Sequence, residues 1–114
     1  MAKKKAGERF PFDKDEELLQ INSPRHRVGG PWCVVYRDKK QRWAIVALDW
    51  DKKPALGIRW FYGKSGTPIS SSYATWFIIP ELIHQAILKK VNASQYVYHY
   101  LSGKISGKEL QKLM

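Results

Sequence analysis

The chain has 114 residues, with 20 basic and 10 acidic side chains and a net charge of +10. This length, with 44% apolar residues, predicts one folded domain and excludes an intrinsically disordered chain. There is no run of eighteen apolar residues to form a membrane helix, and a single cysteine, Cys33, excludes an intrachain disulfide. Because no apolar signal segment follows the basic start, we expect a cytoplasmic protein without a membrane association.

The first part of the chain is expected to hold an arm, a short helix and a loop. Residues 1–12 are expected to be a flexible basic arm. Residues 13–21 can form a helix, with Asp13 as N-cap and Glu16 completing a capping box. Residues 22–31 are predicted to be a loop, because prolines and paired glycines interrupt them.

Three strands are expected next, at residues 32–37, 41–50 and 55–62. Each is rich in β-branched and aromatic residues, and apolar positions recur with a period of two. The turns at residues 38–40 and 51–54 are short and polar, which favours an antiparallel meander.

The stretch from residue 55 to residue 88 holds most of the apolar mass. In its strand, one set of alternating side chains is wholly apolar and is predicted to face the core: Leu56, Ile58, Trp60 and Tyr62. The other set carries Arg59 and Phe61, with Gly57 leaving open backbone. A polar loop at 63–72 precedes a fourth strand at 73–79, which could be buried on both faces.

Helices are expected in the last third of the chain. Pro80 can open an amphipathic helix that ends near Val91 and covers one side of the sheet. Residues 94–101 read as a strand at period 2 and as a helix at period 3.6, and we favour the helix because it follows another helix. A capping box starting at Ser106 predicts a short final helix.

Together these elements predict an α+β fold. We expect an antiparallel four-stranded meander sheet in the order 1-2-3-4, covered on one face by a C-terminal helix, with short flanking helices. The core is expected within residues 32–92.

The strong positive charge predicts attraction to polyanions, of which nucleic acid is the commonest in cytoplasm. Basic residues alternate with aromatic ones on the predicted strands and turns, a pattern typical of single-stranded nucleic-acid binding. Arg59 is the leading candidate, because a cation in mid-strand should either meet a ligand or pair with an acid such as Asp49. The full candidate set is Arg59, Phe61, Lys64, Arg37, Arg42, Trp43, Lys39, Lys40, Lys52 and Lys53, with Trp32 and Tyr36 nearby.

Other kinds of site have weaker support. His26, His84, His99 and Cys33 lack the spacing of a metal site, and no nucleotide-binding glycine loop or serine-hydrolase elbow occurs. We therefore expect no cofactor, no metal and no catalytic residue.

The order of these elements resembles the transcriptional-coactivator-type single-stranded-DNA-binding fold. Ile58-Arg59-Trp60-Phe61 is similar to that family's strand element, and Gly63-Lys64-Ser65-Gly66 to its loop, over about residues 32–92. The family's Lys-Gly-Ile-Ser-Leu step is missing. The resemblance implies a homodimer through the helix and nucleic acid on the opposite sheet face. The chain also looks like small orphan proteins of phages and integron cassettes.

Two alternatives to nucleic-acid binding stay open. One is a ligand- or protein-binding α+β domain of a mobile element, with its cleft under the loop at 63–72. The other is a small basic ribonuclease, which needs only an arginine, histidine or tyrosine near a phosphate.

Overall fold

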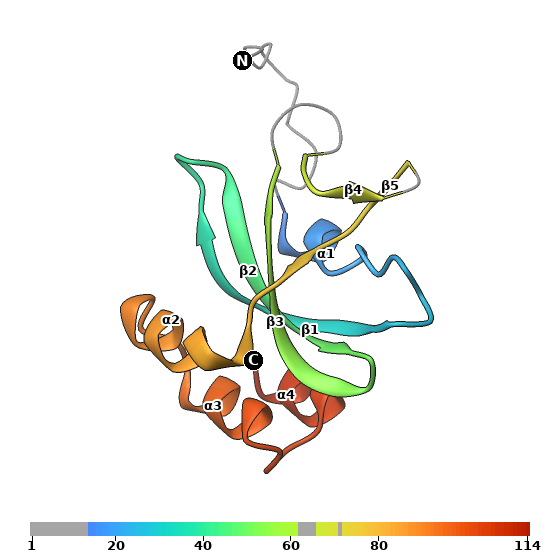
Figure 1. The fold of residues 1–114 in the computed structure, drawn as a ribbon. Coiled ribbons are helices and arrows are strands. Elements are labelled where there is room, and N and C mark those ends of the chain that lie inside the picture. The colour runs from blue at the N-terminus through green and yellow to red at the C-terminus, as the bar shows by residue number, and fades with distance from the viewer. Residues whose placement is uncertain (1–13, 62–65, 71) are drawn as a thin grey trace.

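The computed structural model describes residues 14–61, 66–70 and 72–114. Its centre is a four-stranded antiparallel sheet in the order β1-β2-β3-β6, with strands Val28–Asp38, Trp43–Trp50, Lys53–Trp60 and Phe77–Ile78 (Figure 1). The helical elements are α1 Asp15–Leu18, the 3-10 turn η1 Glu81–Ile83, α2 His84–Lys90, α3 Gln95–Leu101 and α4 Gly107–Leu113. The α+β class, the antiparallel pairing and the strand order are therefore confirmed.

The predicted fourth strand, residues 73–79, is divided between two sheets. Its first part, β5 (Tyr73–Ala74), pairs with β4 (Ile69–Ser70), and β6 alone joins β3. Between the two parts, the Trp76 indole nitrogen turns inward and donates to the carbonyl of Ile21 at 2.8 Å. Burial of this large ring takes the residues around it out of both ladders.

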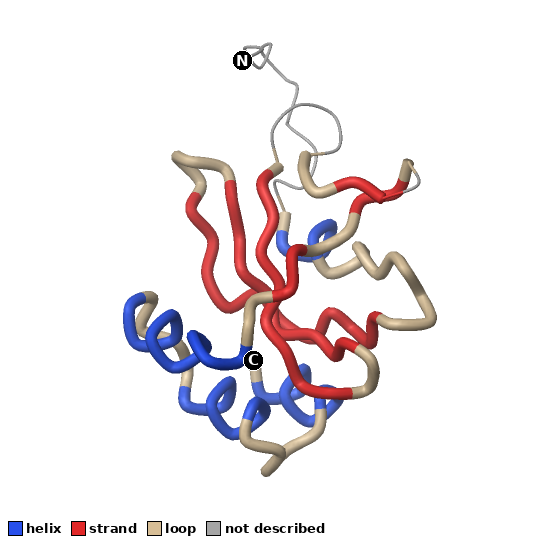
Figure 2. Tube along the Cα trace, in the orientation of Figure 1, coloured by secondary structure: helices blue, strands red, loops and turns tan. Residues whose placement is uncertain are grey.

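The first strand begins at residue 28 rather than 32, because the glycine–proline stretch bends it instead of ending it. Gly29 pairs with Asp49, and register shifts precede Cys33 and Tyr36. Gly30 takes a φ of 79°, which residues with a side chain rarely adopt. Such bulges increase the local twist, and Figure 2 shows β1 turning upward towards the β1–β2 turn.

The ambiguous tail segment is helical, as we favoured. α3 starts after Ser94, whose hydroxyl accepts a backbone hydrogen bond of 3.2 Å. α4 has the predicted capping box, in which Ser106 and Glu109 exchange two hydrogen bonds of 3.1 Å. Helical periodicity prevails because it buries Val97 and Tyr100 together on the sheet.

Two other helix starts differ from the prediction. α1 has Lys14 as its N-cap, and the Lys14 N–H donates to the Glu17 carboxylate at 3.3 Å. The expected pair, Asp13 and Glu16, is thus displaced by one residue, and Asp13 lies outside the described residues. After Pro80 the chain makes a 3-10 turn before α2 begins. In the part of the chain that the structure describes, no helix is long and apolar enough to cross a membrane.

The sheet has a core on each face, because alternate residues of a strand point to opposite sides. The face under α2, α3 and α4, called the helical face, buries Ile45 and Ala47. We call residues 66–70 and 72–76 the flap; the face under α1 and the flap, called the flap face, buries Ala44 and Val46. In Figure 1, α1 and β4–β5 lie beside the upper part of β3, and the C-terminal helices lie below the sheet. The predicted helical cover is confirmed, and the flap face has a second cover.

Candidate nucleic-acid interface

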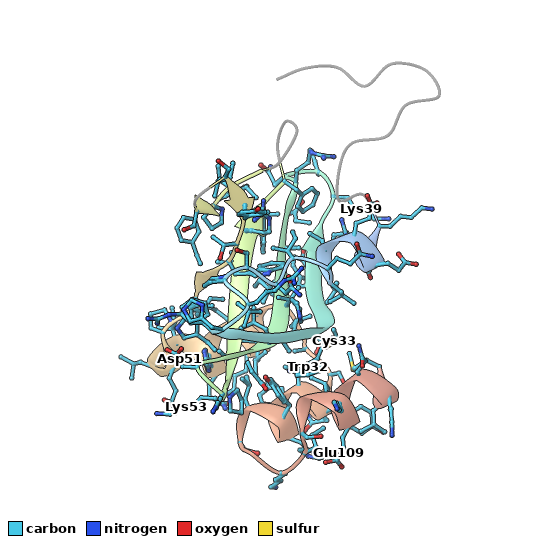
Figure 3. The ribbon with its side chains drawn as sticks, turned by 90° about the vertical axis from the view of Figure 1, so that its right-hand side faces the viewer. Trp32, Cys33, Lys39, Asp51, Lys53 and Glu109 are labelled. Carbon is cyan, nitrogen blue, oxygen red and sulfur yellow. The ribbon has the colours of Figure 1, made fainter. Side chains whose placement is uncertain are left out.

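The predicted basic platform is divided between the two ends of the sheet. The exposed Lys39 and Lys40 form the β1–β2 turn, whereas the exposed Lys52 and Lys53 lie at the β2–β3 turn. Successive turns of a meander lie at opposite ends, and the eight residues of β2 separate these two by about 26 Å. Figure 3 shows Lys39 and Lys53 far apart along the sheet. A compact binding surface therefore includes one lysine pair or the other.

Arg59, the leading candidate, is fully buried on the flap face. Its Nη1 donates to the carbonyl of Pro68 at 3.1 Å and to that of Thr75, and its guanidinium lies 5.9 Å from the Trp76 ring centre. Burial lowers the pKa of the guanidinium to about 10. Arg59 thus binds backbone carbonyls, in place of the ligand or acid that the sequence suggested, and holds the flap on the sheet through Pro68 and Thr75.

Phe61 is also inside the flap face, at 1% exposure. Its carbonyl accepts from Arg42 Nε at 3.2 Å and Nη2 at 2.8 Å. The guanidinium groups of Arg42 and Arg37 lie 4.9 and 5.2 Å from its ring centre, and Arg37 pairs with Asp15 at 2.9 Å. Phe61, Arg42 and Arg37 therefore contribute to packing. Lys64, another of the predicted binding residues, lies outside the described residues.

The predicted assignment of the two faces of β3 is wrong at its upper end. Trp60, expected in the core, is 37% exposed, whereas Arg59 is 0% exposed. The reason is the length of each cover. A helix of seven residues, such as α2, is about 10 Å long, less than half the length of an eight-residue strand. The flap reaches further, because Thr67 forms a bridge with the backbone of Trp60.

Beyond the helices, three rings from three adjacent strands form a continuous row on the helical face. Trp43 on β2 pairs with Trp60 on β3, and their ring centres are 6.3 Å apart. Tyr36 on β1 lies on the other side of Trp43, at 5.4 Å. Tyr36 is 36% exposed, and Trp43 is partly buried. We call these three residues the aromatic row.

Lysines flank the aromatic row at two places. Lys39 and Lys40 follow Asp38, the residue that pairs with Trp43 at the end of the hairpin. Lys89 and Lys90 are exposed in the last turn of α2, whose Ile87 packs against the same core cluster as Trp43. Figures 1 and 2 show α2 on the same side of the molecule as the β1–β2 hairpin.

Three acidic side chains lie on the other face, on α1. α1 carries Asp15, Glu16 and Glu17 in four residues and packs on the flap face through Leu18. Asp15 also neutralises Arg37 there. The acids of α1 share the flap face with Arg37, Arg42 and Arg59, whose guanidinium groups bind within the fold.

Sequence reasoning selected Trp43 and the hairpin lysines, named Tyr36 as a neighbour, and missed Trp60 and the two lysines of α2. Alternation along β3 placed Trp60 on the same face as Leu56, which is correct. The missing signal was the shortness of the expected C-terminal helix relative to the strands, which leaves the far end of that face uncovered.

A cleft of about 440 Å³ lies at the opposite end of the sheet, with Lys52 and Lys104 in its wall. It adjoins Asp49, whose carboxylate accepts from Trp32 Nε1 at 3.1 Å and from the Tyr100 hydroxyl. Burial, together with the bond to Asp49, raises the pKa of Tyr100. Trp32, Asp49 and Tyr100 thus connect β1, β2 and α3 at the end of the helical face that the C-terminal helices cover, which we call its closed end.

Two of the candidate reactive side chains, His84 and Cys33, are buried in the fold. His84 Nε2 lies 2.9 Å from the carbonyl of Ile79, beside a second cleft of about 410 Å³ that Glu81 and Lys53 also line. Cys33 is 5% exposed, and burial raises the pKa of its thiol to about 11. Among the described residues, no group of three or more histidine, cysteine, aspartate or glutamate side chains could hold a metal ion.

No protein-family model, curated protein or solved structure matches the chain.

Proposed function

We propose that the protein binds single-stranded nucleic acid on the aromatic row and does not catalyse a reaction. The observation that carries this proposal is the exposure of Tyr36 and Trp60, with Trp43 between them, on a sheet face flanked by lysines. An aromatic ring that stacks on a base contributes on the order of 1–3 kcal/mol, and lysines bind the phosphates without reading sequence.

The surface fits single strands better than duplexes. In a duplex the bases are stacked on each other and cannot offer their flat sides to protein rings, whereas an unpaired strand can. The rings of this row stand on adjacent strands, so an extended chain of nucleotides can cross the sheet and place successive bases on successive rings.

The test is a salt titration of oligonucleotide binding, followed by fluorescence anisotropy. The double variant Lys39→Gln/Lys40→Gln removes two phosphate contacts and should lower the slope of log Kd against log salt by about 1.4. The matched control is Lys52→Gln/Lys53→Gln, which makes the same change at the other end of β2 and should leave the slope unaltered. Affinity that ignores salt, or equal effects of both variants, contradicts the proposed surface.

A second candidate is a small-molecule-binding domain. Clefts of about 410 and 440 Å³ flank the β2–β3 turn, whereas the loop at 63–72, under which a cleft was expected, lies partly outside the described residues. Their volumes fall within the range of ligand sites. A thermal-shift screen with mononucleotides and amino acids tests it, because Lys52→Gln/Lys53→Gln should then abolish the shift that a ligand produces in the unaltered protein.

A further inference from the structure

We infer that the aromatic row selects strands whose bases are not stacked on one another, and so prefers thymine- or uracil-rich segments to adenine-rich ones. This inference rests on the proposed function and adds the class of nucleic acid that the surface takes. It follows from the spacing and the inclination of the three rings.

The rings are incompatible with a continuous base stack. In a stacked strand, neighbouring bases are parallel and about 3.4 Å apart. In the row, the ring centres of Tyr36 and Trp43 are 5.4 Å apart with planes inclined at 44°, and those of Trp43 and Trp60 are 6.3 Å apart at 65°. Two bases that lie flat on neighbouring rings take the same inclination and cannot remain stacked on each other.

The fold holds in place the backbone of the residues that carry these rings. Trp43 and Trp60 face each other in the β2–β3 ladder, and Trp43 packs against the core of the helical face. The backbone of Trp60 is also bonded in both directions to Thr67, at 2.8 and 3.0 Å. Because β2 and β3 are fixed in this way, the bound nucleic acid has to adapt its conformation to the rings.

The path of the strand follows from the same positions. The row crosses β1, β2 and β3, and its three rings accommodate about three consecutive bases. Lys39 and Lys40 stand at the hairpin end of this path, where they can bind phosphates. Each bound nucleotide has to leave its own stack, which costs most for adenine and least for thymine and uracil, because purines stack more strongly.

The experiment compares fluorescein-labelled dT10, rU10, dA10 and rA10 at one salt concentration. We expect dT10 and rU10 to bind at least about fivefold more tightly than dA10 and rA10, since base preferences on such surfaces follow stacking strength. The ratio of the affinity for dT10 to the affinity for dA10 should decrease between 5 and 45 °C, because heating unstacks the adenine strands. A purely electrostatic surface would show neither effect.

Variants connect this preference to the row. Trp60→Ala and Tyr36→Ala should each weaken dT10 binding by about 5- to 150-fold, the loss expected from one stack of 1–3 kcal/mol. Tyr73→Ala is the matched control, because Tyr73 is 68% exposed on β5, away from the row, and its removal should leave binding unchanged. Trp60→Phe keeps a ring and should restore most of the affinity, which distinguishes stacking from a loss of folding.

The outcomes separate the inference from the proposed function. Equal affinity for the four oligonucleotides, or tighter binding of dA10, overturns the inference while salt-dependent binding through the row stands. Binding that Trp60→Ala and Tyr36→Ala leave intact overturns the row as the site. If no oligonucleotide binds at low salt, both the proposed function and the inference fail.

Discussion

The flap face and the helical face of the sheet differ in how far each cover reaches along β3. On the flap face, every alternate residue from Ala55 to Phe61 is buried. On the helical face, Leu56 is buried, Ile58 is partly buried and Trp60 is exposed, so burial fades along the strand. The extent of the cover therefore decides exposure on this strand, since the cation of Arg59 lies inside and the indole of Trp60 lies outside.

The charges follow the same division. The closed flap face carries its acids on α1, where Asp15 neutralises one of the predicted binding arginines. The open end of the helical face has lysines around exposed rings. The cations of the flap face, Arg37, Arg42 and Arg59, bind within the fold, whereas the lysines of the open end are exposed, as a surface for an anionic ligand needs.

The largest expected effect is that of Arg59→Ala on the closed face. The change leaves the carbonyls of Pro68 and Thr75 without their donor and opens a cavity beside Trp76, so the free energy of unfolding should fall by roughly 3–5 kcal/mol. Urea denaturation followed by circular dichroism measures the loss. Arg59→Lys should recover part of it, and a loss below about 1 kcal/mol would show that this guanidinium does not hold the flap.

The next effect concerns Cys33, in the covered part of the helical face. Burial raises the pKa of its thiol from 9.0 to about 11, so the thiolate fraction at pH 8 is about 100-fold lower than for an exposed cysteine. Reaction with a disulfide reagent should therefore be at least that much slower in the native protein than in urea. Since the folded state keeps this proton longer than the unfolded state, the contribution of Cys33 to stability should decline as the pH rises from about 9 to 11. Fast reaction of the native protein would mean that the helices open readily.

Tyr100→Phe should have an intermediate effect at the closed end of the same face. The hydroxyl donates to the carbonyl of Leu48 and to the carboxylate of Asp49, and removing it should cost about 2 kcal/mol of unfolding free energy. Tyr98→Phe is the control, because Tyr98 lies on the same helix and is only partly buried. Equal losses in both variants would argue against a special role for the Asp49 cluster.

The smallest expected effect on stability is that of Trp60→Ala, on the open end. Because the ring is 37% exposed, the loss should stay near 1 kcal/mol, whereas Trp76→Ala should cost roughly 3–5 kcal/mol, since Trp76 is 4% exposed on the flap face. Two tryptophans changed in the same way thus compare the two faces directly. Similar losses would show that the aromatic row is part of the core.

The elements that could be predicted from the sequence depend on local signals. Ser106 and Glu109 are three residues apart and cap α4 by direct hydrogen bonds. The alternation from Trp43 to Trp50 identifies β2 and assigns its residues to two faces. The antiparallel order follows from short turns between successive strands.

The predictions that failed depend on partners distant in sequence. Arg59 is buried because it binds the carbonyl of Thr75, sixteen residues later in the chain, and no local sequence pattern predicts that bond. Trp60 is exposed because the C-terminal helices end short of it. Trp43 and Lys39 could be selected as candidates because they occupy a strand end and a turn. Nucleic-acid binding, the homodimer and the cytoplasmic location stay predictions.

The bond between Trp76 and Ile21 spans 55 residues, and that between the Tyr100 hydroxyl and the carbonyl of Leu48 spans 52. On the ribosome, the carbonyl of Ile21 therefore lacks its donor until Trp76 has emerged, and the carbonyl of Leu48 lacks Tyr100 for longer still. The apolar surface that Trp76 and Tyr100 cover is exposed during that interval, and such late, long-range contacts slow folding and favour aggregation of a nascent chain.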